Sequence, residues 1–260
     1  MLLYVGALVG APLFLVFQQV FAPGWHALNQ ALHDPEMLAA LTLTVRVAAV
    51  AVPLNLLFGI GTSLWIVRQP SRWTRLLDLL IDVPLAISPI IIGLILELAY
   101  ANNGWFGSTL AGLGLQLIFS YWGLVIVSAF VSLPLISRQV IPLLREVGTQ
   151  QDQTAATLGA GPARIFWTIT MRSIAWAVAY GLTLTFARVI GEYGAVLIVS
   201  GNIGFRTETL TLNIGNNFEN FNTYQGFVGA SLLATVSLVV LILLGVARHR
   251  ERNRSGHLAS

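Results

Sequence analysis

Several ionisable residues lie inside predominantly apolar stretches, among them Arg46, Asp82, Arg188 and Glu192. A charge in lipid costs about 3 kcal/mol or more unless it meets an opposite charge or water. Arg188 and Glu192 are four residues apart, a spacing that would place them as a pair on one face of a helix. This pair, together with Asp82, would either hold helices together or border a path for a solute.

In a solute path the candidates would play different parts. Arg188 would attract an anion, because a cation acts strongly in a low-dielectric cavity. Glu192 would repel the same anion, so gating or packing is expected for it. Ser88 precedes a proline and could hydrogen-bond a solute or satisfy a backbone group freed by a kink. Asp82, Ser88, Arg188 and Glu192 are therefore the candidates for a translocation path or gate.

Covalent chemistry has few candidates. The chain has no cysteine, which excludes thiol nucleophiles, disulfides and cysteine-ligated metals. Its four histidines fall in loops or the tail, outside every apolar run. The phosphate-binding pattern GxxxxGK[ST] is absent, so we expect no ATP binding by the chain itself. The sequence predicts a protein that is not an enzyme and that binds no metal or cofactor.

The composition places these residues in a membrane protein. Hydrophobic residues make up 56% of the 260 residues and charged residues 10%, against about 25% charged in a soluble domain. A spanning helix needs roughly 20 apolar residues. We expect a single all-α domain over residues 1–260 with about six spans. The predicted spans are 2–21, 38–67, 76–100, 121–144, 174–200 and 227–246.

Each end of the chain allows two interpretations. The first apolar segment lacks the basic start and small-residue cleavage site of a signal peptide, so we expect a true span. The basic tail 247–260 could suggest nucleic acid, but directly after an apolar span it indicates the cytoplasmic face. Lipid is therefore the expected surrounding, and no nucleic-acid partner is expected.

Arginine sets the predicted orientation, because all 14 basic residues are arginine. They gather in the loops near residues 70 and 160 and in the tail, whereas residues 22–37 and 101–120 contain none. Positive residues favour the cytoplasmic side. Both loops and the C-terminus are therefore predicted to be cytoplasmic.

The segment 148–173 joins two predicted spans and has its own local signals. Thr149 can cap a short helix, with Asp152 in the place of a capping-box acid. Gly159 can end that helix in the left-handed conformation, and Pro162 suits the first position of another. Small side chains at Ala155 and Ala160 would let a partner approach closely, although a plain helical connection would look the same.

This segment resembles the EAA signature of ABC importer permeases. The residues Gln153-Thr154-Ala155 occupy E-A-A and Gly159 its glycine, whereas Ile169, Met171 and Arg172 occupy I, L and P of the closing I-x-L-P. The spacing is intact and four residue types differ. The resemblance implies a coupling helix that docks on an ATP-binding subunit. The coupling residues it implies are Gln153, Thr154, Ala155, Leu158, Gly159, Ala160 and Ile169.

Three further blocks resemble sulfate permeases of the W type (CysW): 82–89, 188–195 and 199–203. The resemblance covers residues from about 24 to 246. It implies the type I ABC importer permease fold and transport of sulfate or thiosulfate across a bacterial inner membrane. The implied partners are a T-type permease subunit, a homodimeric ATP-binding subunit that binds ATP and Mg, and an extracytoplasmic sulfate-binding protein.

Three alternatives remain open at this point. A homodimeric permease for molybdate or tungstate would belong to the same superfamily. An ion-coupled carrier would work without an ATPase, but the sequence shows no two-fold internal repeat to support it. An intramembrane enzyme would need an activated nucleophile, and the usual ones are missing.

Overall fold

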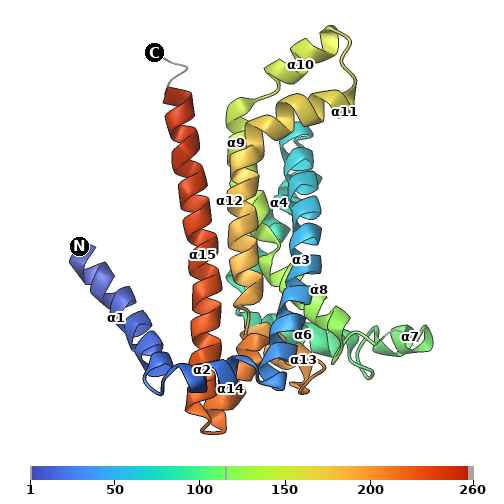
Figure 1. Cartoon of the computed structure of the whole chain (residues 1–260). Helices are drawn as coiled ribbons and strands as arrows, with labels where there is room; N and C mark the ends of the chain where they lie inside the picture. The colour runs from blue at the N-terminus through green and yellow to red at the C-terminus, as the bar shows by residue number, and fades with distance from the viewer. Residues whose placement is uncertain (1, 115, 257–260) are drawn as a thin grey trace. The chain divides into compact units, whose positions relative to one another are not determined.

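The computed structural model describes residues 2–114 and 116–256, and all regular secondary structure in this part is helical. The all-α prediction is confirmed. The elements, most of them labelled in Figure 1, are α1 (Leu2–Phe21), α2 (Trp25–Leu32), α3 (Pro35–Arg68), α4 (Arg72–Ile81), α5 (Val83–Ala86), α6 (Pro89–Tyr100), α7 (Gly107–Gly112), α8 (Tyr121–Ser132), α9 (Pro134–Val147), α10 (Gln150–Thr157), α11 (Pro162–Ile165), a π-helical turn (Phe166–Thr170), α12 (Met171–Ile190), α13 (Gly194–Ser200), α14 (Leu210–Glu219) and α15 (Thr223–Gly256).

Five of the six predicted spans correspond to candidate spans in the structure. One of the five is a broken pair, formed by Arg72–Ala86 and Pro89–Tyr100. The first predicted span is helical as α1, within which Gly10–Phe21 is a shorter apolar helix. The four unbroken candidates are Pro35–Arg68, Tyr121–Val147, Pro162–Ile190 and Thr223–Val240.

Two predicted spans differ from continuous helices. The span 76–100 is interrupted where α4 ends at Ile81 and α6 begins at Pro89. Proline has no backbone N–H and fits the first turn of a helix, so Pro84 and Pro89 begin α5 and α6 instead of kinking one long helix. The span 174–200 likewise ends early, because α12 stops at Ile190.

The chain forms two compact units. Unit 1 takes its described residues from Met1–Ala49, Pro89–Ser128 and Ile190–Val239. Unit 2 takes its described residues from Val50–Ser88, Ala129–Val189 and Val240–Ser260. The prediction of one domain over residues 1–260 stays a prediction, and residues 257–260 of the predicted tail lie outside the described residues.

Unit 1 is held by packing between helices that are distant in sequence. Its core joins Val20 of α1, Met37 of α3, Leu210 of α14 and Val228 of α15, all almost fully buried. The Thr44 hydroxyl accepts a hydrogen bond of 2.8 Å from the backbone N–H of Leu210. This bond satisfies one of the backbone donors that the start of α14 leaves unpaired.

Unit 2 is built around α9. Buried Ile136, Val140 and Leu144 of α9 pack with Ile174 and Val178 of α12. In lipid, helix association depends on close van der Waals packing and on interhelical hydrogen bonds. An interhelical hydrogen bond is also present, since the buried Asn55 amide of α3 donates to Ser132 Oγ of α8 at 2.7 Å.

Candidate functional site

The short helix α10 of unit 2 buries none of its side chains, and most of them are exposed. Figure 1 shows α10 and α11 in the connection between α9 and α12. Within α10, Gln153 and Thr154 are exposed and Ala155 is half-buried. Just beyond it, the apolar side chain of Leu158 is 83% exposed. A single exposed leucine is common on protein surfaces, but this one directly follows a helix whose small side chains would let a partner approach closely.

Gly159 ends α10 as the sequence predicts, with φ of +84°. The Gly159 N–H donates to the Ala156 carbonyl and the Ala160 N–H to the Ala155 carbonyl, both at 3.0 Å. These two bonds form a Schellman motif, which needs a left-handed residue at the position of Gly159. The prediction that Pro162 begins the next helix is also confirmed.

The predicted capping box at Thr149 and Asp152 is wrong. Thr149 occupies the N-cap position, but its side chain makes no capping hydrogen bond. The Asp152 carboxylate instead pairs with Arg68, the last residue of α3. The Thr170 hydroxyl donates to Asp152 Oδ1 at 3.3 Å and accepts from Arg68 Nη2 at 2.8 Å. A tertiary ion pair therefore replaces the local interaction that the sequence pattern indicates.

The remaining coupling residue, Ile169, lies in the π-helical turn and is half-buried. α10 packs against this turn and against α11. The structure thus brings Ile169 and the α10 segment into one substructure of unit 2, as the spacing of the signature requires. Their role in coupling stays a prediction at the level of the single chain.

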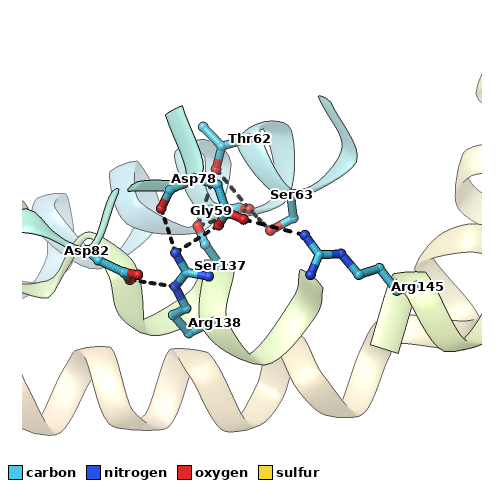
Figure 2. A network of polar contacts seen from close by, with 8 residues as sticks. All are labelled: Gly59, Thr62, Ser63, Asp78, Asp82, Ser137, Arg138 and Arg145. Carbon is cyan, nitrogen blue, oxygen red and sulfur yellow. Dashed lines mark hydrogen bonds and ion pairs between the residues drawn. The ribbon is translucent and has the colours of Figure 1, made fainter. Parts of the chain in front are cut away.

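Asp82 lies at the break between α4 and α5, where it bonds to a residue that is not among the predicted site residues. Arg138 of α9 donates from Nε to Asp82 Oδ1 at 2.6 Å. The same guanidinium pairs with Asp78 Oδ1 at 2.8 Å and donates to the Asp78 carbonyl at 2.6 Å. Figure 2 shows Arg138 pointing at both aspartates. Asp82 therefore has a structural partner within unit 2.

A second group of polar contacts in Figure 2 lies at Gly59 of α3. Its carbonyl accepts from Ser63 at 2.5 Å and from Ser137 of α9 at 3.5 Å. The hydroxyls of Thr62 and Ser137 are 3.2 Å apart. These hydroxyls satisfy one another between helices, as buried polar groups in membranes must.

The remaining three path candidates lie at or beyond the ends of helices: Arg188, Ser88 and Glu192. Arg188 lies in the last turn of α12, and Ser88 is exposed between α5 and α6. Glu192 lies beyond the end of α12 at Ile190, so the four-residue helical spacing does not apply to Arg188 and Glu192. The buried Glu192 carboxylate accepts from the N–H of Ala195 at 3.0 Å, near the start of α13. The assignment of these residues to a path stays a prediction.

Unit 1 contains a buried carboxyl group that the sequence interpretation missed. Glu208 precedes α14 and is 3% exposed. It accepts hydrogen bonds from the amides of Asn216 at 2.8 Å and Asn213 at 3.3 Å. Burial raises the pKa of Glu208 above its ordinary value of 4.5, and the neighbouring charge of Glu36 raises this pKa further against the effect of the amide bonds. No local pattern marks this position as buried.

Asn202 takes part in the same cluster of unit 1. Its amide donates to Asn216 Oδ1 at 2.7 Å, and the Asn216 amide donates back to Asn202 Oδ1 at 3.1 Å. Asn202 has φ of +51°, a conformation that asparagine tolerates better than most residues. These bonds give Asn202 a structural role in the loop between α13 and α14.

The raised pKa of Glu208 predicts a pH-dependent stability. As the pH rises from 4.5, the unfolded chain loses this proton first, so stability is lost as the pH passes through the raised folded-state pKa. Thermal unfolding of the detergent-solubilised protein between pH 4.5 and neutral pH would measure this loss. In Glu208→Gln the contribution is expected to disappear. An identical pH dependence in both proteins would refute the assignment.

Comparison with known proteins identifies the class. Residues 55–253 match the family described as the binding-protein-dependent transport system inner membrane component. This match covers more than half of the chain and includes α10 and its surroundings. The chain belongs to this family of membrane permeases. It is therefore a multi-pass inner-membrane transport component, as predicted, and not an enzyme.

Several relatives within this family are permease proteins of sulfate transport systems. The chain is 38% identical to the sulfate transport system permease protein CysW of Synechococcus elongatus over 98% of this chain and 89% of the relative. It is 39% identical to CysW of Escherichia coli K12 over 97% and 89%. Identity to the E. coli K12 permease protein CysT is 31% over 97% and 91%. The resemblance to W-type permeases is confirmed.

Solved structures show the same fold. A chain of a bacterial ABC transporter involved in the import of the polysaccharide alginate matches with a TM-score of 0.74 over 96% of this chain and 92% of that chain, at 13% identity. A chain of an amino acid ABC transporter matches with a TM-score of 0.58 over 86% and 97%, at 15% identity. The predicted fold of type I importer permeases is therefore confirmed.

Proposed function

We propose that this chain is one of two permease subunits of an ATP-driven importer that carries sulfate or thiosulfate across the bacterial inner membrane. Identity of 38–39% to CysW proteins over almost the whole chain supports the substrate. The observation that carries the ATP-driven mechanism is α10, a helix without buried side chains that ends at a left-handed glycine beside an exposed leucine.

The same comparisons support two of the proposed partners, a second permease subunit and a binding protein. A T-type permease is the proposed second subunit, since this chain is similar to both CysW and CysT. A solved relative of the same fold binds a periplasmic protein loaded with its substrate, which supports a separate sulfate-binding protein here. Two copies of an ATP-binding subunit would bind ATP and Mg and contact α10. The chain itself would hold no cofactor.

In this mechanism the permease transmits force and offers a path. ATP binding closes the ATPase dimer, α10 moves with the surface on which it is docked, and the permease helices change their packing. Such a change requires an interaction that differs between two states of the complex. The arginine-rich loops and tail support a cytoplasmic position for α10 and the C-terminus.

Gly159→Asp tests the coupling assignment. A side chain at φ of +84° is strained, and the new charge would lie at the negative end of the α10 dipole. We expect ATP-dependent uptake of radiolabelled sulfate into vesicles to fall at least about 10-fold. The vesicles would contain both permeases, the ATPase and the binding protein, and co-purification would show that the complex still assembles.

Gly161→Asp is the matched control. It places the same charge two residues away, where φ is −69° and an added side chain meets open space. Near-normal uptake is expected for it. Equal uptake in the two variants would contradict the role of α10. If sulfate is not taken up but molybdate or tungstate competes at the binding protein, the transported ion is one of these instead of sulfate. If uptake persists without the ATPase, the chain is an ion-coupled carrier.

A further inference from the structure

The ion pair between Arg68 and Asp152 has no part in the mechanism so far, although it joins α10 to α3. Arg68 is the last residue of the 34-residue helix α3, and Asp152 lies in the first turn of α10. Their positions in the sequence are 84 residues apart. The pair is thus a tertiary contact between a candidate span and the proposed docking helix, both within unit 2.

Thr170 contacts both residues of the ion pair, so the three side chains form a triangle. The Thr170 hydroxyl accepts from Arg68 Nη2 at 2.8 Å and donates to Asp152 Oδ1 at 3.3 Å. Thr170 is almost fully buried, whereas the side chains of Arg68 and Asp152 are 36% and 19% exposed. Solvent therefore weakens the attraction between the two charges in part, and the buried Thr170 hydroxyl holds both side chains in place.

Thr170 belongs to the last turn before α12. It ends the π-helical turn Phe166–Thr170, and Met171 begins α12. Short π-helical segments within α-helices occur often at functional positions. Through these three residues the triangle connects the end of α3, the start of α10 and the turn that leads into α12.

Asp152 is the main tether of α10. Among the side-chain hydrogen bonds of residues 2–114 and 116–256, those of Gln153, Thr154 and Thr157 stay within α10 or its N-cap, and Asp152 alone reaches other elements. α10 buries no side chain, and its packing contacts are with α11 and the π-helical turn. Force applied to α10 would therefore pass to α3 chiefly through this carboxylate, and to α12 through this carboxylate and the packed turn.

We propose that Arg68, Asp152 and Thr170 form the polar link that passes movement of the docked α10 directly to α3 and α12. Arg68 is in this sense a positioning residue for energy coupling, and it contacts neither ATP nor the transported ion. The proposal rests on the proposed function, because it assumes that α10 is where the ATPase acts. Loss of the link would leave ATP hydrolysis intact and make it less productive.

A charge exchange in the reconstituted four-component complex tests the link. The measured quantity is sulfate taken up per ATP hydrolysed, which a general loss of folded protein does not change. Arg68→Asp and Asp152→Arg are each expected to lower this ratio about 10-fold, and the double variant to restore it to within about 3-fold of the wild type. The Thr170 hydroxyl both donates and accepts, so it can serve the exchanged pair.

Two further variants make the result decisive. Arg72→Asp makes the same charge change four residues beyond Arg68, at an exposed arginine, and should leave the ratio unchanged. Thr170→Val keeps both charges and the side-chain shape and removes only the hydroxyl, so an approximately 3-fold loss is expected. If the charge variants fail to assemble, an unchanged ratio in Thr170→Val overturns the proposal.

Other outcomes separate this link from the proposed function. Normal ratios in assembled Arg68→Asp and Asp152→Arg complexes, with uptake still lost in Gly159→Asp, would remove the link and keep the coupling helix. A double variant no better than the single variants would also overturn the link. Uptake that is insensitive to Gly159→Asp, or that needs no ATPase, would instead remove the proposed function.

Discussion

Replacing Gly59 by valine is expected to destabilise unit 2 by about 3 kcal/mol, because an overpacked core forces the backbone of packed helices to shift. A Cβ added at Gly59 would lie 2.7 Å from Ile136 Cβ and 2.8 Å from Ile136 Cγ2. Ile136 has no room to withdraw, since a Cβ at Gly181 of α12 would lie 2.9 Å from Ile136 Cα. α9 is thus packed between two glycines of α3 and α12.

The matched control is Gly61→Val, two residues further along α3. A Cβ at Gly61 meets open space, and valine has the same helix propensity at both positions. The yield of monodisperse protein from membranes and its melting temperature in detergent would measure the difference. Similar values for the two variants would show that the close approach of α3 and α9 is not required.

Arg138→Met is expected to destabilise the protein by about 2 kcal/mol, since bonds to charged groups are stronger than neutral ones. Asp82 would lose its partner, and Asp78 would keep only the longer contact with Arg145. The Arg138 side chain is 31% exposed and contacts both Asp78 and Asp82. Methionine retains most of the apolar stem, so the loss reports on the charge. The loss of stability should be largest at the break between α4 and α5, where Asp82 lies.

Arg145→Met serves as the control for this substitution. Arg145 also lies on α9 and reaches Asp78, but at 3.4 Å and with 59% of its side chain exposed. Such an exposed pair contributes about 0.5 kcal/mol or less. Thermal unfolding in detergent distinguishes the two cases, and equal melting temperatures for both variants would contradict the network in Figure 2.

The sequence predicted those features that depend on neighbouring residues. Apolar stretches of spanning length became helices, because backbone groups in lipid must satisfy one another within the segment. The end of α10 at Gly159 and the start of α11 at Pro162 follow from the conformations those residues prefer. The spacing of the coupling signature was also sufficient to indicate the family, although four of its residue types differ.

The breaks within spans were not predictable in the same way. Hydropathy stays high from Leu76 to Tyr100, although the helix is interrupted before Pro89. Mean hydropathy does not distinguish a broken apolar segment from an unbroken one, although Pro84 and Pro89 mark where α5 and α6 begin. α12 likewise ends at Ile190, so Glu192 lies outside the helix that contains Arg188.

By itself, the sequence determined that this chain is a helical membrane permease with an exposed, glycine-ended α10. Only the tertiary structure decided which charges meet. Asp82 and Arg138 are 56 residues apart, and Arg68 and Asp152 are 84 apart. Glu208 lies in a polar stretch typical of a surface loop, yet it is buried. Such contacts depend on how helices pack, and no local pattern in the chain records that packing.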